Sequence, residues 1–196
     1  MQRRHNEYFN RDVVDIVAGE YYVSREAEIV TTLLGSCVAT CLFDPEVGVG
    51  GMNHFMLPGQ LQPGPIFASE AGRYGMFAME RLINELLKMG ARREKLVAKV
   101  FGGANLLGGQ NDASRVPEQN VLFTLEYLQL ENIPVLISDV GGVVGRRIYM
   151  FTDSGRVLLK RLGGKPVRTV AQKEVVYQKN LRKREASGSR VEWFRN

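Results

Sequence analysis

The chain has 196 residues, 44% hydrophobic and 24% charged, which is ordinary for a globular protein of one domain or two small ones. No apolar run reaches the roughly 20 residues that span a bilayer, and the polar N-terminus lacks the apolar stretch of a secretory signal. Two cysteines in a chain of this length exclude a disulfide framework. We therefore expect a cytoplasmic protein that is not inserted in a membrane.

The net charge of +5 is concentrated at the C-terminal end. Residues 165–196 hold nine Lys and Arg against three Glu, which leaves 17 of 26 basic and 18 of 21 acidic residues in 1–164. We predict a folded domain over 1–164 and a basic, flexible tail over 165–196 that carries no catalytic residue. Such a tail suits solvation or an acidic partner surface. The body resembles no nucleic-acid-binding module, so we expect no nucleic acid partner.

Runs of β-branched and apolar residues, bounded by Gly, Pro and Asp, predict the strands. In chain order these cover 13–17, 21–24, 27–34, 37–43, 49–57, 95–101, 133–139, 146–152 and 156–162. Ser69 can cap a helix that runs to about Met89, and Gly90 can end it. Pro117 suits the first turn of a second helix that runs to about Glu131. Consecutive strands at both ends exclude a regular doubly wound fold, so the pattern predicts an α/β domain with mixed β-sheet layers and two main helices.

One short apolar stretch holds both cysteines, Cys37 and Cys41, together with His54. An imidazole beside a thiol can take its proton, which populates the nucleophilic thiolate near neutral pH. The alternative is that a buried cysteine is an inert, small apolar residue, and this interpretation suits Cys41. For Cys37, the pattern alone leaves both interpretations open.

A hairpin would bring this thiol and imidazole together. Asp44 followed by Pro45 suits a type I turn between the two predicted arms. If Asp44 pairs with residue 47, then Cys37 lies directly opposite His54 on the neighbouring strand. A bulge at Gly48 would shift that register by one residue.

Small residues flank the predicted thiol–imidazole pair on both arms. Gly35 and Ser36 leave little bulk before the sulfur, so a substrate chain could approach, and backbone N–H groups near Ser36 and Cys37 could stabilise an oxyanion. Gly50 and Gly51 are expected to leave similar room on the partner strand.

A third group should orient the imidazole of His54, as in any catalytic triad. Thr31 and Thr32 on the preceding strand are the nearest candidates, whereas Asn53 should point to the opposite face by strand alternation. A zinc site built from Cys37, Cys41, His54 and His5 is disfavoured, because residues i and i+4 of a strand lie roughly 13 Å apart.

The same residues resemble the chemoreceptor glutamine deamidase family, CheD. The pairing of LGSC with NHFMLP is specific, and the matching segments span residues 19–162 in the family's order. They are GEYYVS (19–24), TTLLGSCVATCLFDP (31–45), GGMNHFMLP (50–58), KVFGGAN (99–105), ENIPVLISDVGG (131–142) and GRRIYMFTDSGRVLLKRL (145–162). Where the family carries a Gly-x-Arg-Asn segment, this chain has Pro117–Asn120, which keeps only the asparagine.

The resemblance implies an enzyme that converts glutamines on the cytoplasmic helices of chemotaxis receptors to glutamates, without a cofactor. The family's thiol, histidine and threonine map onto Cys37, His54 and Thr31, the last lying six positions before the cysteine. Its fold is similar to the catalytic domain of the cytotoxic necrotizing factor toxins. A phosphatase of the CheC type is a further expected partner. The alternatives are a cysteine protease or transglutaminase, a receptor methylesterase with the same dyad, and a non-catalytic adaptor.

Overall fold

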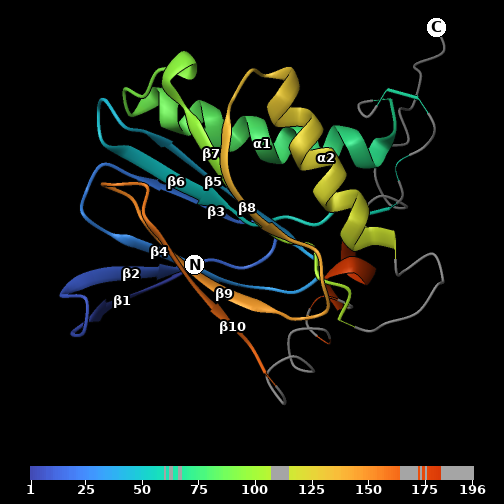
Figure 1. The fold of residues 1–196 in the computed structure, drawn as a ribbon, viewed down its shortest axis with the longest axis horizontal. Coiled ribbons are helices and arrows are strands. Elements are labelled where there is room, and N and C mark those ends of the chain that lie inside the picture. Colours follow the sequence, from blue (N-terminus) through green and yellow to red (C-terminus); the bar gives the residue numbers. More distant parts are fainter. Residues whose placement is uncertain are drawn as a thin grey trace, which may run out of the picture.

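The computed structural model describes residues 1–59, 61, 64–65, 68–106, 115–163, 172, 174 and 176–181. It contains two five-stranded sheets and two long helices (Figure 1). The elements are β1 (Gln2–Asn6), β2 (Arg11–Asp15), β3 (Tyr21–Ser24), β4 (Ile29–Leu34), β5 (Val38–Asp44), β6 (Val49–Asn53), α1 (Glu70–Lys88), the 3-10 turn η1 (Arg93–Lys95), β7 (Val97–Gly102), α2 (Val116–Leu130), β8 (Val135–Val140), β9 (Arg146–Phe151) and β10 (Val157–Arg161).

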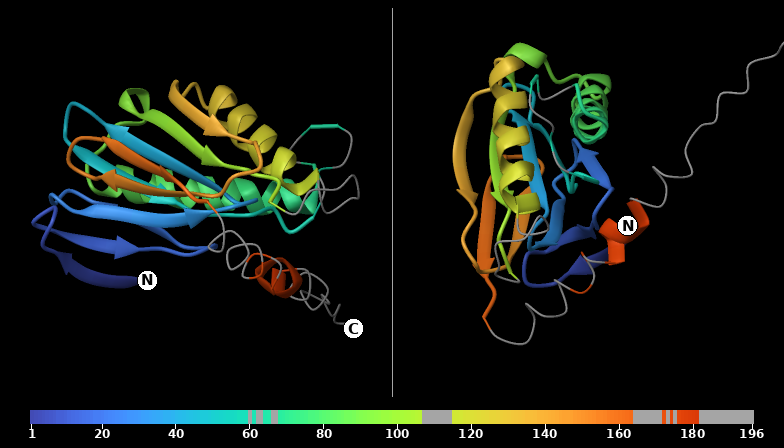
Figure 2. Two further views of the ribbon diagram at one scale, coloured as in Figure 1. Left: turned by 60° about the horizontal axis from the view of Figure 1, so that its bottom comes forward. Right: turned by 90° about the vertical axis from the view of Figure 1, so that its right-hand side faces the viewer.

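The two sheets are mixed, and they pack face to face. Their strand orders are β1-β2-β4-β9-β10 and β3-β6-β5-β7-β8, with β2–β4 and β7–β8 parallel and the other pairs antiparallel. Apolar side chains of both sheets form one buried cluster, which includes Val30 and Met150 from the first sheet and Cys41 and Met52 from the second. Helices α1 and α2 cover the outer face of the second sheet (Figures 1 and 2). The predicted α/β class with mixed sheets and two helices is confirmed.

The helix boundaries follow the predicted caps. The Ser69 hydroxyl accepts a hydrogen bond from the Gly72 N–H at 3.0 Å, and α1 begins at Glu70, directly after Ser69. Gly90, with φ +93°, follows the helix in the left-handed region that glycine tolerates best. Pro117 lies in the first turn of α2, where its missing N–H leaves no helical hydrogen bond unmade.

Strand β1 is the element that the sequence reading missed. Its residues, QRRHN, are polar and mostly exposed, so they give no alternating apolar pattern. The strand forms by backbone pairing with β2 at the edge of the first sheet, in the register Gln2–Asp15 to Asn6–Arg11. Backbone hydrogen bonds stabilise such an edge strand without apolar side chains.

The β5–β6 hairpin has a longer loop than expected, so the predicted pairing of Asp44 with residue 47 is wrong. Asp44 pairs with Val49, and the Gly48 N–H donates to the Asp44 carbonyl at 3.0 Å. Gly48 has φ +65°, which lets the loop close over four residues instead of two. A shift by two residues preserves the face on which each side chain lies.

As a result, Cys37 and His54 are diagonal neighbours and not a directly opposed pair. The isolated bridge between Val38 and Phe55 continues the observed register, which places Cys37 across from Met56, two residues beyond His54. Cys37 directly precedes β5 and His54 directly follows β6, so both lie where the regular ladder ends.

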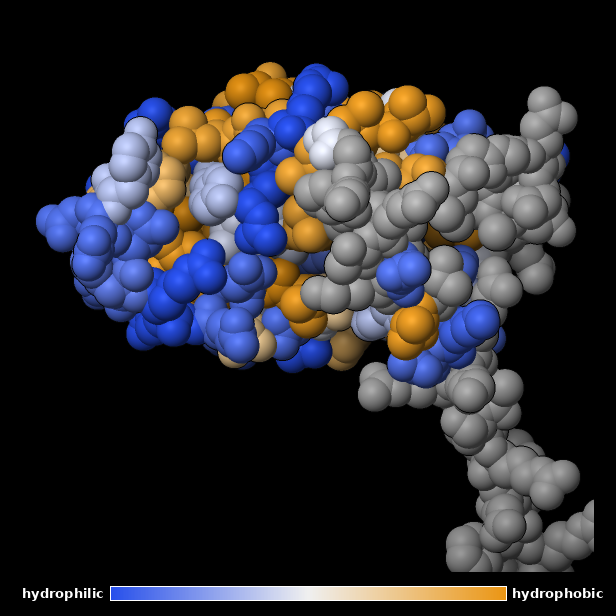
Figure 3. All heavy atoms as spheres, turned by 90° about the horizontal axis from the view of Figure 1, so that it is seen from below, coloured by the Kyte–Doolittle hydropathy of each residue, from blue (hydrophilic) through white to orange (hydrophobic). Residues whose placement is uncertain are grey.

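Part of the predicted tail packs on the body. Gln172, Glu174 and residues 176–181 are helical, and we call them the C-terminal helical segment. Glu174 and Leu181 are buried, and Figure 2 shows the segment beside the strands of the first sheet. Trp193 and Phe194, the tail residues with the most apolar surface, lie outside the described residues. Hydrophilic and hydrophobic side chains are interspersed over the lower face of the molecule (Figure 3).

No helix in the part of the chain that the structure describes is long and apolar enough to cross a membrane.

Candidate active site

The loop that carries Cys37 is clamped by the glycine-rich loop after β7. The Gly103 N–H donates to the Cys37 carbonyl at 2.7 Å, and the Ala104 N–H donates to the Gly35 carbonyl at 2.6 Å. A Cβ atom on Gly102 would lie 2.1 Å from the Cys37 carbonyl oxygen, and Gly102 has φ +115°. Only glycine permits this approach, so the loop after β7 fixes the backbone of the cysteine.

Asn120 on α2 holds the same loop from the other side. Its Nδ2 donates to the Ser36 carbonyl at 2.8 Å, while its Oδ1 accepts from the Leu57 N–H at 2.8 Å. Because a trans peptide unit is planar, fixing the Ser36 carbonyl also fixes the direction of the Cys37 N–H. The sequence reading missed this role. The available signal was that Asn120 alone remains of the family's Gly-x-Arg-Asn segment.

Three consecutive backbone N–H groups converge in front of the sulfur. Those of Gly35, Ser36 and Cys37 donate to the carboxylate of Glu174 at 3.0, 2.8 and 3.2 Å, and the Ser36 hydroxyl donates to it at 2.7 Å. Such an array of backbone donors is an anion-binding nest of the kind that stabilises oxyanions. The predicted donors near Ser36 and Cys37 do bind one carboxylate: the Gly35 and Cys37 N–H groups share its Oε1, and the Ser36 N–H and hydroxyl share its Oε2.

The imidazole of His54 is oriented by Thr32. The Thr32 hydroxyl lies 2.7 Å from His54 Nδ1 and donates to the Ile16 carbonyl at 2.7 Å. A hydroxyl has a single hydrogen, so Thr32 must accept the bond from Nδ1–H. This fixes the tautomer and leaves Nε2 unprotonated. Nε2 is buried, and among the described residues it has no hydrogen-bond partner, so its lone pair is available for a proton.

The predicted contact between Thr31 and His54 is wrong. The Thr31 hydroxyl donates to the Ile148 carbonyl on β9 at 2.8 Å. Successive side chains of β4 alternate between faces, and Thr32 shares the face that looks toward the second sheet. Thr31 points to the other face, so no contact with the imidazole supports a catalytic role for it.

The thiol, the imidazole and the Glu174 carboxylate form one buried group. One ligand atom from each lies within 4.8 Å of the others. Burial, followed by the charge of Glu174, raises the pKa of Cys37 well above its ordinary value. Burial lowers the pKa of His54 to about 4, although the carboxylates of Glu174, Asp15 and Glu20 act in the opposite direction. In this arrangement both the thiol and the imidazole are neutral at pH 7.

The four side chains of the disfavoured zinc set do not come together. His5 lies on the exposed strand β1, where its Nδ1 is 3.1 Å from Asp12. Cys41 lies in the core between the sheets, and burial raises its pKa. Cys37, His54 and Glu174 are ligand types for a metal. However, the N–H groups that point at Glu174 favour an anion at this position and disfavour a cation.

Gly50 and Gly51 do not widen the site, contrary to expectation. A Cβ atom on Gly50 would lie 2.6 Å from the Thr152 carbonyl oxygen, and one on Gly51 would lie 2.6 Å from Val23. These glycines therefore permit close packing within the domain. A Cβ atom on Gly35 would lie 2.5 Å from Leu106 and 2.6 Å from the Glu174 carboxylate, so this glycine permits close packing too, here including the approach of the carboxylate.

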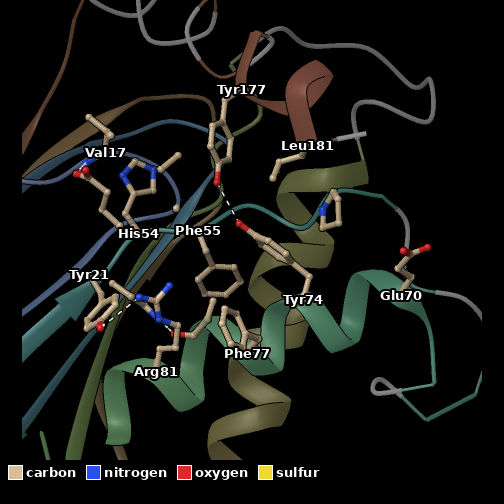
Figure 4. A pocket seen from close by; sticks show the side chains of 16 residues that line it. Val17, Tyr21, His54, Phe55, Glu70, Tyr74, Phe77, Arg81, Tyr177 and Leu181 are labelled. Atoms are coloured by element: carbon tan, nitrogen blue, oxygen red, sulfur yellow. Dashed lines mark hydrogen bonds between the residues drawn. The ribbon is translucent and has the colours of Figure 1, made fainter. Parts of the chain in front are cut away.

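Two hollows meet at His54. The larger, of about 670 Å³, lies between the segment 17–21 and α1, and Figure 4 shows the aromatic and charged side chains that line it. The smaller, of about 370 Å³, is lined by Thr32, Asp15 and Glu174 among others. Tyr177 lines both, and its hydroxyl lies 3.0 Å from that of Tyr74 (Figure 4).

A cysteine beside a base of fixed tautomer, with an oxyanion-binding nest, is typical of enzymes that transfer acyl groups through a thioester. Comparison with known proteins gives the family. The family described as CheD chemotactic sensory transduction matches residues 56–161, and the chain belongs to it. A "Probable chemoreceptor glutamine deamidase CheD 1" of Shewanella oneidensis is 43% identical over 98% of this chain and 92% of its own.

Relatives from other bacteria extend the similarity over the thiol and the histidine. The "Probable chemoreceptor glutamine deamidase CheD" of Methylobacillus flagellatus is 44% identical, and the one of a Janthinobacterium species is 46% identical. Each comparison covers 95% of this chain and 91% of the relative. The predicted family is confirmed.

Proposed function

We propose that this protein is a glutamine deamidase of chemotaxis receptors, with Cys37 as the nucleophile and His54 as the base and acid. The names of the relatives support the reaction and the substrate class. The observation that carries the assignment of residues is that the thiol, the imidazole and three backbone N–H donors all lie around one buried carboxylate, that of Glu174.

In the first half of the reaction, Nε2 of His54 takes the thiol proton and the Cys37 sulfur attacks the carboxamide carbon of glutamine. The developing oxyanion accepts hydrogen bonds from the N–H groups of residues 35–37. The imidazolium then gives its proton to the departing amine, the C–N bond breaks, and ammonia leaves a thioester on the sulfur.

In the second half, neutral His54 removes a proton from water, which attacks the thioester carbon. The same N–H groups hold the second oxyanion, the C–S bond breaks, and the imidazolium returns its proton to the sulfur, which gives a glutamate and the free thiol. Thr32 keeps Nε2 directed at the reacting atoms in both halves, and Asn120 keeps the Cys37 N–H in the nest. Hydrolysis of this kind requires no cofactor.

The substrate in this proposal is a glutamine on the cytoplasmic helices of a chemotaxis receptor, which places the enzyme in the cytoplasm. A phosphatase of the CheC type is a proposed second partner. The edge strand β8 exposes Leu136 and Ile137, yet no described feature shows what would cover them.

The test is incubation with a receptor cytoplasmic fragment, with mass spectrometry for Gln-to-Glu conversion and an assay for ammonia. We expect both products from the wild type and neither from the Cys37→Ala variant. Methanol in place of ammonia, with methylated glutamates as the substrate, would assign the site to a methylesterase instead. Receptor binding without either product would leave an adaptor and contradict the proposal.

A further inference from the structure

The carboxylate of Glu174 occupies the oxyanion nest of the protein's own active site. It accepts three backbone N–H bonds and one hydroxyl bond, and the residue is only 8% exposed. The residue lies 137 positions from Cys37 in the chain, so the contact is a tertiary one. A glutamate side chain at this place is what deamidation of a glutamine would leave behind.

The rest of the C-terminal helical segment follows the hollow away from the sulfur. Tyr177 and Leu181, three and seven positions after Glu174, lie on the same helix face and line the larger hollow beside Tyr74 (Figure 4). A Cβ atom on Gly19 would lie 2.6 Å from the Tyr177 hydroxyl, so this ring fits closely against the body. Gln172, Val176 and Lys179 are exposed. One face of the segment therefore binds the site and the other faces solvent.

Occupation of the nest by Glu174 opposes catalysis in two ways. A substrate carboxamide has nearly the shape of this carboxylate, and its oxygen would need the Gly35 and Cys37 N–H groups that already donate to Glu174 Oε1, so the two cannot bind together. In addition, a negative charge next to the sulfur disfavours the thiolate, which is the reactive form.

We propose that the C-terminal helical segment is an intramolecular product analogue, which lies in the place of the substrate helix and holds the enzyme in an inhibited state until a receptor displaces it. This inference rests on the proposed deamidase function. It adds that the substrate glutamine lies on a helix whose residues at +3 and +7 line the hollow beside Tyr74.

The first test is the Glu174→Gln variant, which turns the product analogue into a substrate. We expect Cys37 to attack the carboxamide at position 174, ammonia to leave, and water to hydrolyse the thioester, so that position 174 is recovered as glutamate. Peptide mapping should find the amide intact when Cys37→Ala is combined with Glu174→Gln. Gln172, exposed in the same segment, is the internal control and should keep its amide in both proteins.

The second test is the Glu174→Ala variant, assayed on a short glutamine peptide. Removing a competing ligand lowers KM and leaves kcat unchanged, and KM falls about tenfold if the free site is about 10% populated in the wild type. Gln172→Ala is the matched control and should retain the wild-type KM. Equal KM values for wild type and Glu174→Ala would contradict the inhibition.

A receptor fragment in the same reactions separates the two proposals. Conversion of the fragment while position 174 keeps its amide would overturn the product-analogue inference and leave the deamidase function standing. Conversion of neither the fragment nor position 174 would overturn the deamidase function itself.

Discussion

The two ends of the β5–β6 hairpin are built from similar residues but differ in what surrounds them. At the turn end, the Thr152 carbonyl occupies the space beside Gly50, and Val23 occupies the space beside Gly51. At the open end, Gly35 borders a carboxylate and Cys37 lies next to His54. At both ends, therefore, glycine permits close packing, but only at the open end is one of the close neighbours a carboxylate beside the candidate nucleophile.

The two cysteines make the same contrast. Both are fully or almost fully buried, Cys37 at 0% and Cys41 at 2% exposure, so accessibility does not separate the nucleophile from the core residue. The difference lies in the neighbours: Cys37 has an imidazole and a nest of N–H donors, while Cys41 packs among apolar side chains of both sheets.

The largest expected effect comes from the cysteines. Cys37→Ala should lower deamidation by more than about a thousandfold, because the bond-forming atom is removed. Cys41→Ala should keep most of the activity and lose stability by the smaller amount expected for one buried atom. Turnover of a receptor fragment, with thermal unfolding of each variant, measures both. If Cys37→Ala and Cys41→Ala lost activity to the same extent at equal stability, the distinction between a nucleophile at Cys37 and a core residue at Cys41 would be contradicted.

The second largest effect on activity is expected where the backbone at Gly102 contacts the Cys37 carbonyl. Gly102→Ala should reduce activity strongly, because a Cβ 2.1 Å from the Cys37 carbonyl oxygen forces the loop out of position. A displacement of the nucleophile by about 1 Å lowers the rate about a hundredfold. Circular dichroism and unfolding should show a folded but destabilised protein. Wild-type kcat in this variant would mean that the loop after β7 does not position the nucleophile.

Substituting the two threonines on β4 is expected to affect different properties, activity for Thr32 and stability for Thr31. Thr32→Val removes the acceptor of the His54 Nδ1–H bond, so kcat should fall by up to about a hundredfold and its pH dependence should change. Thr31→Val should leave kcat nearly unchanged and cost about 1–3 kcal/mol of stability, because the Ile148 carbonyl loses a buried donor. The reverse order of kcat values would restore Thr31 as the orienting residue.

Much of this fold was predictable because its signals are local. Ser69, Gly90 and Pro117 mark helix ends through their own hydrogen bonding and backbone preferences, and apolar runs mark the central strands. The register of the β5–β6 hairpin was not predictable, because it depends on whether Gly48 adopts φ > 0, which the sequence permits but does not require. The face of Thr32 follows only once the packing of two sheets is known.

Glu174 was outside the reach of the sequence reading for a different reason. It lies in a stretch whose composition suggests a solvated tail, and its partners are residues 35–37. Neither periodicity nor spacing relates two segments so far apart. The signal that existed was an apolar pair, Tyr177 and Leu181, at helical spacing within a basic stretch.

A smaller effect concerns the reactivity of Cys37. The charge of Glu174 raises the pKa of this thiol, so Glu174→Ala should lower that pKa and shift the rise of alkylation with pH toward lower pH. The direction follows because only the thiolate reacts and the charge opposes its formation. Iodoacetamide labelling measured by peptide mapping across pH 6–9 gives the profile, with Gln172→Ala as the control. An unchanged or higher midpoint would contradict this electrostatic effect.

The smallest effect on chemistry is expected at the turn end. Gly50→Ala should cost about 1–3 kcal/mol of stability through overpacking against the Thr152 carbonyl oxygen, with kcat and KM unchanged below the melting transition. Denaturant unfolding and peptide assays measure the two quantities. A lower kcat in fully folded Gly50→Ala protein would show that the turn end and the open end of the hairpin are coupled.

The most direct test of the central claim is to measure residual deamidase activity against the fraction of Cys37 alkylated in the same wild-type samples. The account predicts a straight line that reaches zero activity when Cys37 is fully labelled, with Cys41 unmodified throughout. Substantial ammonia release from protein whose Cys37 is completely alkylated would contradict it.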